Sequence, residues 1–168
     1  IRALPLGVNE FLSIHGSSLQ NLWVGGPEGV LILSVYDGAT WSRSLVTTRD
    51  LAMNPEDDPQ LPLRILGVWA RHEEDGQGKI TLREVWAVGD FGAIVRWNGS
   101  AWLAQASGTT QNLLGVWGSD TNNVWAVGVG GVIVKWNGTA WSAQASGTTQ
   151  NLSAVWGTDA SNVWAVGA

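Results

Sequence analysis

The stretch ASGTTQNLLGVWGSDTNNVWAVG at residues 106–128 occurs a second time, almost unchanged, as ASGTTQNLSAVWGTDASNVWAVG at 145–167. Five of the 23 positions differ, and the two copies start 39 residues apart. The stretches NGSAWLAQ (98–105) and NGTAWSAQ (137–144) have the same spacing. Self-similarity with a period of 20–50 residues is typical of repeat architectures, in which each copy buries its apolar surface against the next.

Fainter copies lie upstream. The segment FLSIHGSSLQNLWVGG (11–26) fits residues 113–128 without a gap, which puts His15 at the position of Trp117. The segment ILGVWA (65–70) starts another copy, with Trp69 at that position. The repeats therefore predict three complete units, one half unit and one strand remnant, which are residues 11–46, 65–106, 113–145, 152–168 and 1–6 respectively.

Each unit contains four short apolar runs separated by turn residues, which predicts four antiparallel strands. Asn137-Gly138 is a strong hairpin signal, and this turn would place Trp136 opposite Trp141. Asp120 and Asp159 are expected to accept hydrogen bonds from nearby backbone N–H groups in Asx turns. Runs such as VWAVG are continuous rather than alternating, which indicates strands that are covered on both faces.

Four-stranded units stacked face to face predict an all-β protein, a β-propeller built of antiparallel blades. An open β-solenoid is the alternative, although its coils are usually shorter than 39 residues. Three full blades and partial blades do not make a closed ring of the usual four to eight blades. Three explanations stay open: the chain is part of a longer propeller, two copies complete one ring, or the chain closes a strained four-blade ring.

The pattern VWAVG…WNG…W resembles the Trp-rich bacterial propeller repeats that are related to the kelch and Asp-box groups. LWVGG (22–26) followed by VYDGATW (35–41) is similar to the kelch pattern, whereas the later copies lack its second glycine. SVYDGATW (34–41) resembles an Asp-box, but Tyr36 stands where that box has its aspartate. The resemblance implies a propeller and says little about activity, because propellers support many unrelated functions.

The composition excludes several classes of protein. Charged residues are 14% and hydrophobic residues 45% of the 168 residues, which argues against a disordered chain or a coiled coil. The net charge of −5 disfavours binding to nucleic acid, and no apolar run is long enough for a membrane helix. The chain has no cysteine, so it cannot form a disulfide or a thiolate metal site.

The 12 tryptophans are the most conspicuous candidates for ligand binding. Exposed indoles stack on sugars and on peptide side chains, but indoles at fixed repeat positions inside apolar runs more often fill the space between blades. Trp102 and Trp141 adjoin the hairpin turns and are expected nearest the rim. The candidate ligand-binding residues are Trp41, Trp102 and Trp141.

Two polar insertions, 47–63 and 71–84, make the units unequal and are expected to be surface loops. Glu73, Glu74 and Asp75 in the second insertion are the candidate contacts for a partner. Acidic loops can hold a hard cation, but neither insertion fits a known calcium motif, so solvated loops are favoured.

The sequence predicts no metal site, cofactor or catalytic residue. His15 replaces a packing tryptophan and His72 opens an insertion, which does not make a ligand pair. The favoured function is a non-catalytic binding or assembly scaffold, with a protein partner or self-association that completes the propeller. The alternatives are a multivalent lectin with Trp-lined pockets between blades, and an enzyme whose catalytic residues lie in blades outside this sequence.

Overall fold

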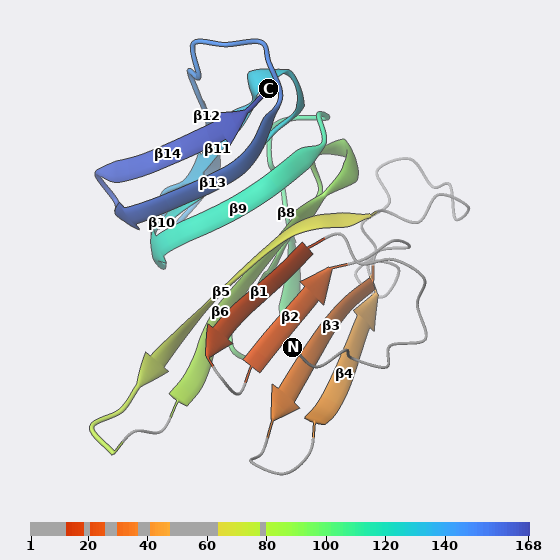
Figure 1. The fold of residues 1–168 in the computed structure, drawn as a ribbon, viewed down its shortest axis with the longest axis vertical. Coiled ribbons are helices and arrows are strands. Elements are labelled where there is room, and N and C mark those ends of the chain that lie inside the picture. The colour runs from red at the N-terminus through yellow and green to blue at the C-terminus, as the bar shows by residue number, and fades with distance from the viewer. Residues whose placement is uncertain (1–12, 19–20, 26–29, 37–40, 48–63, 78–79) are drawn as a thin grey trace.

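The computed structural model describes residues 13–18, 21–25, 30–36, 41–47, 64–77 and 80–168. These residues form three four-stranded antiparallel sheets and one two-stranded sheet, in chain order (Figure 1). The predicted strand remnant at 1–6 lies outside the described residues, and so does the predicted insertion at 47–63 except for Thr47, which ends β4. The strands are β1 Ser13–Ser18, β2 Asn21–Gly25, β3 Val30–Tyr36, β4 Trp41–Thr47, β5 Ile65–Glu74, β6 Ile80–Gly89, β7 Ile94–Trp97, β8 Trp102–Gln105, β9 Leu113–Asp120, β10 Asn123–Gly128, β11 Ile133–Trp136, β12 Trp141–Gln144, β13 Leu152–Asp159 and β14 Asn162–Gly167.

Each sheet is an up-and-down meander, as the blade prediction requires. The hairpin between β11 and β12 pairs Trp136 with Trp141, as predicted, with ring centroids 6.0 Å apart. The Asx turns are also confirmed: Asp120 Oδ1 accepts the N–H of Asn122 at 2.8 Å, and Asp159 Oδ1 accepts that of Ser161 at 2.8 Å. Local turn chemistry therefore fixes the strand pairing inside each blade.

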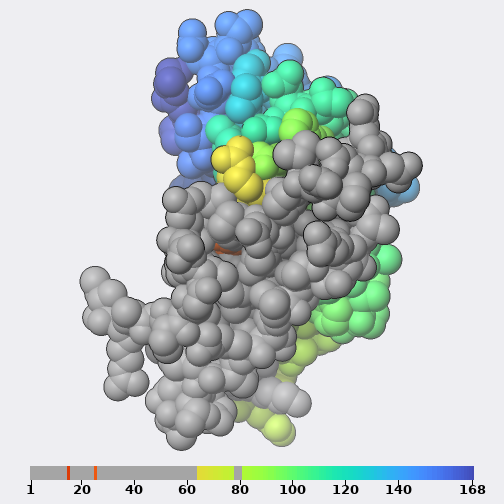
Figure 2. All heavy atoms as spheres, turned by 90° about the vertical axis from the view of Figure 1, so that its right-hand side faces the viewer, coloured from red at the N-terminus to blue at the C-terminus, as the bar shows by residue number. Residues whose placement is uncertain are grey.

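The blades follow one another along an arc (Figure 1), with the first strand of each packed against the first strand of the next. Thus β1 lies against β5, β5 against β9, and β9 against β13. The C-terminal sheets lie at one end of the long axis of the molecule (Figure 2). The outward face of the two-stranded sheet is exposed, with Val166 63% accessible. The ring is therefore incomplete in this chain, as the sequence analysis predicted.

Two apolar clusters form the described core. The larger lies between the second and third blades and includes Trp86, which is fully buried. Trp86 packs against Trp136 and Trp141 of the next blade, with centroids 5.2 and 5.1 Å away. Indoles at repeat positions thus join neighbouring blades.

A second inter-blade contact recurs on the first strands. The six-membered ring of Trp69 lies over Gly118, and that of Trp117 lies over Gly157. An added Cβ would come within 2.8 Å of Trp69 Cη2 at Gly118 and within 2.6 Å of Trp117 Cη2 at Gly157. Only glycine leaves room for a large ring at this distance, so each large ring on one blade is matched by a glycine on the next.

The first two blades use a smaller pair at the same positions. His15 takes the place of the tryptophan, and Ala70 takes the place of the glycine. His15 is partly buried and forms a hydrogen bond with the backbone of Ala70. Burial lowers the pKa of His15, although this hydrogen bond acts in the opposite direction.

The insertion at 71–84 is not the surface loop that the sequence analysis expected. Strands β5 and β6 continue through it and pair as far as Glu74 and Ile80. A cross-strand ion pair supports this extension: Glu73 on β5 accepts a hydrogen bond from Arg83 on β6 at 2.9 Å, and a second one from Arg71 on its own strand at 2.8 Å. A polar sequence can therefore prolong a hairpin, because opposite charges on paired strands stabilise it.

Candidate functional site

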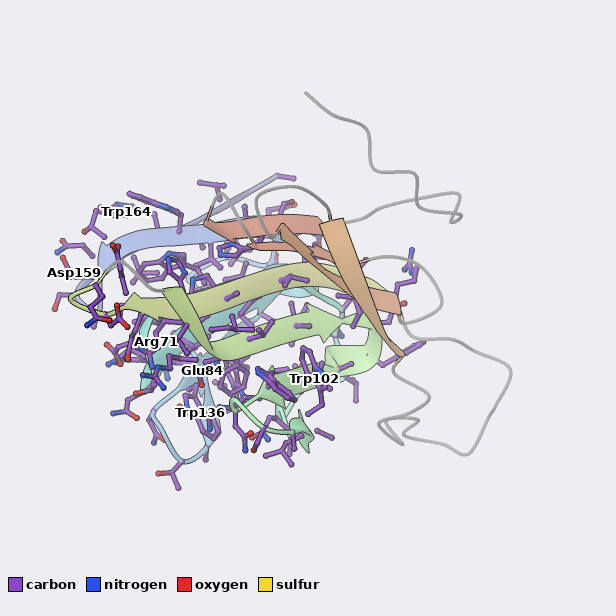
Figure 3. All side chains as sticks on the ribbon, turned by 90° about the horizontal axis from the view of Figure 1, so that it is seen from below. Arg71, Glu84, Trp102, Trp136, Asp159 and Trp164 are labelled. Carbon is purple, nitrogen blue, oxygen red and sulfur yellow. The ribbon has the colours of Figure 1, made fainter. Side chains whose placement is uncertain are left out.

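The predicted ligand-binding tryptophans occupy different environments. Trp141 is only 9% exposed and packs against Trp86, so its side chain fills the core between two blades. Trp102, labelled in Figure 3, is half-buried on β8. Its ring centroid lies 5.9 Å from that of Trp97. Trp41 starts β4 opposite Tyr36, and its side chain lies outside the described residues. The three residues start the fourth strands of three different sheets, β4, β8 and β12.

The predicted partner residues Glu73, Glu74 and Asp75 do lie together, at the exposed end of the β5–β6 hairpin. The hydrogen bond from Arg71, together with the charges of Arg71 and Arg83, lowers the pKa of Glu73. Asp75 Oδ1 accepts the N–H of Gln77 at 3.0 Å. The charge of Glu73 is therefore already matched by arginines of the same hairpin.

A buried carboxylate lies on β6, the second strand of this hairpin. The side chain of Glu84 is 2% exposed, and its Oε1 accepts a hydrogen bond from Arg96 Nε at 2.6 Å. Its Oε2 has no hydrogen-bond partner among the described residues, and Arg71 Nε lies 3.9 Å away (Figure 3). Burial raises the pKa of Glu84, although the charge of Arg96 and its hydrogen bond act to lower it.

The guanidinium of Arg96 also covers two indoles. Its Cζ lies 5.2 Å from the ring centre of Trp86 and 5.5 Å from that of Trp136. The next blade repeats the arrangement with Lys135, whose Nζ lies 4.7 Å from the ring centre of Trp125. This repetition in two blades indicates a packing role, in which a cation lies over the face of an indole.

The turn between β6 and β7, Asp90–Gly92, carries an exposed aromatic side chain. Phe91 is 54% exposed and has a φ of +53°. Among the described residues, it is the one non-glycine residue with a left-handed backbone. The corresponding residue in the next blade is Gly130, with a φ of +69°. A left-handed conformation costs a residue with a Cβ about 1–2 kcal/mol relative to the right-handed one.

Hydrogen bonds from distant residues hold the Phe91 turn in place. Asn112 Oδ1 accepts the N–H of Phe91 at 2.9 Å, just as Asn151 Oδ1 accepts that of Gly130 at 3.0 Å. Arg64 forms two side-chain hydrogen bonds with Asp90, each 2.9 Å long. The side chain of Phe91 is thus presented to solvent by a turn that is fixed at both its first and its second residue.

Phe91 lies beside a shallow hollow of about 640 Å³. The other wall is the connection between β8 and β9, which carries uncharged polar side chains and small residues. Ser107 fixes this connection, since its hydroxyl donates to Thr109 O at 3.1 Å. The hollow therefore offers one aromatic ring and several hydrogen-bonding groups. It is lined by Phe91–Ala93 and by 105–111.

The sequence analysis did not single out Phe91. An alignment of the repeats could have identified it. The turn GDFG (89–92) corresponds to GVGG (128–131), so Phe91 stands where the next copy has Gly130. A bulky residue at a glycine position of a repeat suggests a special role for that copy. The exposure of the Phe91 side chain and its backbone angle, which only the structure gives, identify it as a candidate binding residue.

The described residues show two further absences. They contain no group of three or more metal-ligating side chains of the His, Cys, Asp or Glu type. In the same part of the chain, no helix is long and apolar enough to span a membrane.

Comparison with known proteins agrees with this architecture. No protein-family model matches the chain, and no curated protein does. Among solved structures, the chain is similar to YCF48 bound to D1 peptide, with 15% identity and a TM-score of 0.55 over 83% of this chain and 42% of that one. It is also similar to the C-terminal WD40 domain of Sif2, with 16% identity and a TM-score of 0.59 over 89% and 41% of the two chains. The chain thus spans less than half the length of either structure, and it has the fold of a β-propeller.

Proposed function

We propose that this chain is a non-catalytic scaffold that binds a protein partner at the hollow beside Phe91. The observation that carries the proposal is the exposed aromatic ring on a left-handed backbone. Such conformations persist where the surroundings enforce them, and they cluster at binding and catalytic sites. Asn112, Arg64 and Asp90 supply that enforcement here.

The chemistry of the hollow favours an extended peptide segment with an apolar side chain. The ring of Phe91 can pack against that side chain, and the polar groups of residues 105–111 can pair with the peptide backbone. None of the lining residues is charged, so affinity would come from apolar burial and hydrogen bonds. The similar structure of YCF48 contains a bound peptide, which is consistent with this class of ligand.

The other expectations of the sequence analysis are secondary parts of this proposal. The acidic tip at Glu73–Asp75 is a further partner contact, and the kelch-like and Asp-box-like character of the repeat stays a resemblance. A lectin would need similar exposed indoles in each pocket between blades. Because Trp141 is buried and Trp102 half-buried, a protein partner is preferred to a glycan.

The test uses a displayed library of random peptides, selected on the wild-type chain, together with a glycan array. Peptides that bind should lose at least tenfold in affinity when Phe91→Asn removes the ring, because asparagine tolerates the left-handed backbone. Leu103→Asn is the matched control, since Leu103 is 44% exposed outside the lining of the hollow. Selected peptides that bind the Phe91→Asn chain equally well would refute the site, and binding to glycans alone would favour the lectin.

A further inference from the structure

The two-stranded sheet exposes a surface that the preceding blade keeps buried. Val127 and Trp125 in the third blade are 0% and 9% exposed. Their counterparts 39 residues later, Val166 and Trp164, are 63% and 54% exposed. The local sequence NVWAVG is identical in both places, so the difference comes from the next blade, whose β13 packs against β9 and β10.

The exposed surface is already in its packing conformation. Trp156 and Trp164 stack with centroids 6.1 Å apart, like Trp117 and Trp125, whose centroids are 5.8 Å apart. Trp156 is 60% exposed, and Trp164 points outward from the sheet (Figure 3). With Ala154 and Val166, the two indoles line a hollow of about 380 Å³. We call the surface formed by Ala154, Trp156, Trp164 and Val166 the terminal face.

The inter-blade contacts specify what fits this face. The ring of Trp69 packs on Gly118, and that of Trp117 packs on Gly157. By the same pattern, the ring of Trp156 would pack on a glycine at the equivalent position of another blade's first strand. Among the described first strands, β9 and β13 already use their glycines, and β5 has Ala70, which pairs with His15. The remaining first strand, β1, carries Gly16 at this position, immediately after His15.

We propose that the terminal face binds a second copy of this chain, with Trp156 of one copy packed on Gly16 of the other. The contact continues an interface that the chain forms twice within itself. Two copies joined head to tail in both directions would bring together six four-stranded and two two-stranded sheets of described residues, which does not exceed the eight blades of large propellers. This proposal does not depend on the Phe91 site.

The experiment is sedimentation velocity of the 168-residue chain over a range of concentrations. The expected species has twice the mass of the 17.9 kDa chain. Trp156→Ser should weaken dimerisation at least tenfold without affecting folding, because the ring is largely exposed within one chain. Leu103→Ser, which removes a comparably exposed apolar side chain elsewhere, should leave the dimer unchanged.

A mixing experiment tests the pairing itself. Gly16→Leu should block the acceptor strand, so that this variant alone and Trp156→Ser alone are both monomeric. An equimolar mixture should associate as a 1:1 dimer, because one intact Trp156 and one intact Gly16 remain. If Gly16→Leu does not fold, as judged by circular dichroism, the Trp156→Ser result decides. A wild-type chain that stays monomeric, or a dimer that Trp156→Ser leaves intact, overturns the proposal.

Discussion

The six-membered ring of Trp69 lies against the backbone of Gly118 in the next blade, where a Cβ would approach ring carbons Cη2 and Cζ3 to 2.8 and 2.9 Å. A Cβ at Gly118 would also lie within 2.9 Å of Val124 Cγ2. The blade interface is therefore built on the absence of a side chain at one position and the presence of a large ring at another.

This contact predicts that Gly118→Ala destabilises the chain by about 1–3 kcal/mol, the usual cost of overpacking a core. The cost should be smaller in a Trp69→His background, which imitates the His15 and Ala70 pair of the first two blades. The measurement is the free energy of unfolding in urea for the four members of the double-mutant cycle. Gly76→Ala is the control, because no atom lies within 4 Å of its added Cβ, and a similar loss there would contradict the explanation.

The buried ion pair predicts a strong asymmetry between single and double substitutions. Arg96→Met leaves Glu84 buried without its hydrogen-bonded cation, and removing one partner of a buried pair costs about 3–5 kcal/mol. Arg71, 3.9 Å away, should keep the loss toward the lower end of that range. The double variant Arg96→Met with Glu84→Leu should recover most of the stability. Equal losses in the single and the double variant, measured by urea unfolding, would show that packing rather than charge dominates.

The strained turn predicts that Phe91→Asn keeps the stability of the chain or raises it by up to about 1 kcal/mol, because asparagine accepts the left-handed region at lower cost. Asn112→Ala should act in the opposite direction, since it removes the acceptor of the Phe91 N–H, and a typical hydrogen bond contributes about 1 kcal/mol. Thermal unfolding midpoints of the two variants distinguish these outcomes. A clear loss of stability in Phe91→Asn would mean that the ring supports the fold.

The Asx turn at Asp120 predicts a pH dependence. Burial by itself would raise the pKa of Asp120, but hydrogen bonds from Asn122, Asn123 and Ser119 outweigh it, and the pKa is lowered. A carboxylate whose pKa is lower in the folded state stabilises the fold above its unfolded pKa of about 3.9, and this contribution is lost as the pH falls through the folded value.

Asp120→Asn should therefore be less stable than the wild type at pH 7 and should lose less stability on acidification from pH 5 to pH 2. Unfolding midpoints along this pH series provide the measurement. Glu74→Gln on the exposed hairpin is the control for removing one negative charge. Parallel curves for Asp120→Asn and the wild type would exclude a contribution of the Asp120 carboxylate to acid stability.

The sequence by itself determined the blade. The 39-residue repeat, the Asn-Gly turns and the Asx residues act within a few tens of residues, so they specify strand order, the Trp136 and Trp141 pair and the turn at Asp120 without reference to other blades. The sequence also indicated that the ring is incomplete, since that conclusion needs only the count of strands.

The tertiary structure decided which of these repeated residues are covered and which are exposed. Trp125 and Trp164 have the same neighbours in sequence, yet one is buried and the other exposed, because burial depends on whether another sheet packs on that face. The left-handed turn at Phe91 depends on Asn112, 21 residues away, and the buried state of Glu84 depends on Arg96 and the surrounding indoles. The repeat determines the strand pairing within each blade, whereas contacts between blades determine which side chains are exposed and able to bind a partner.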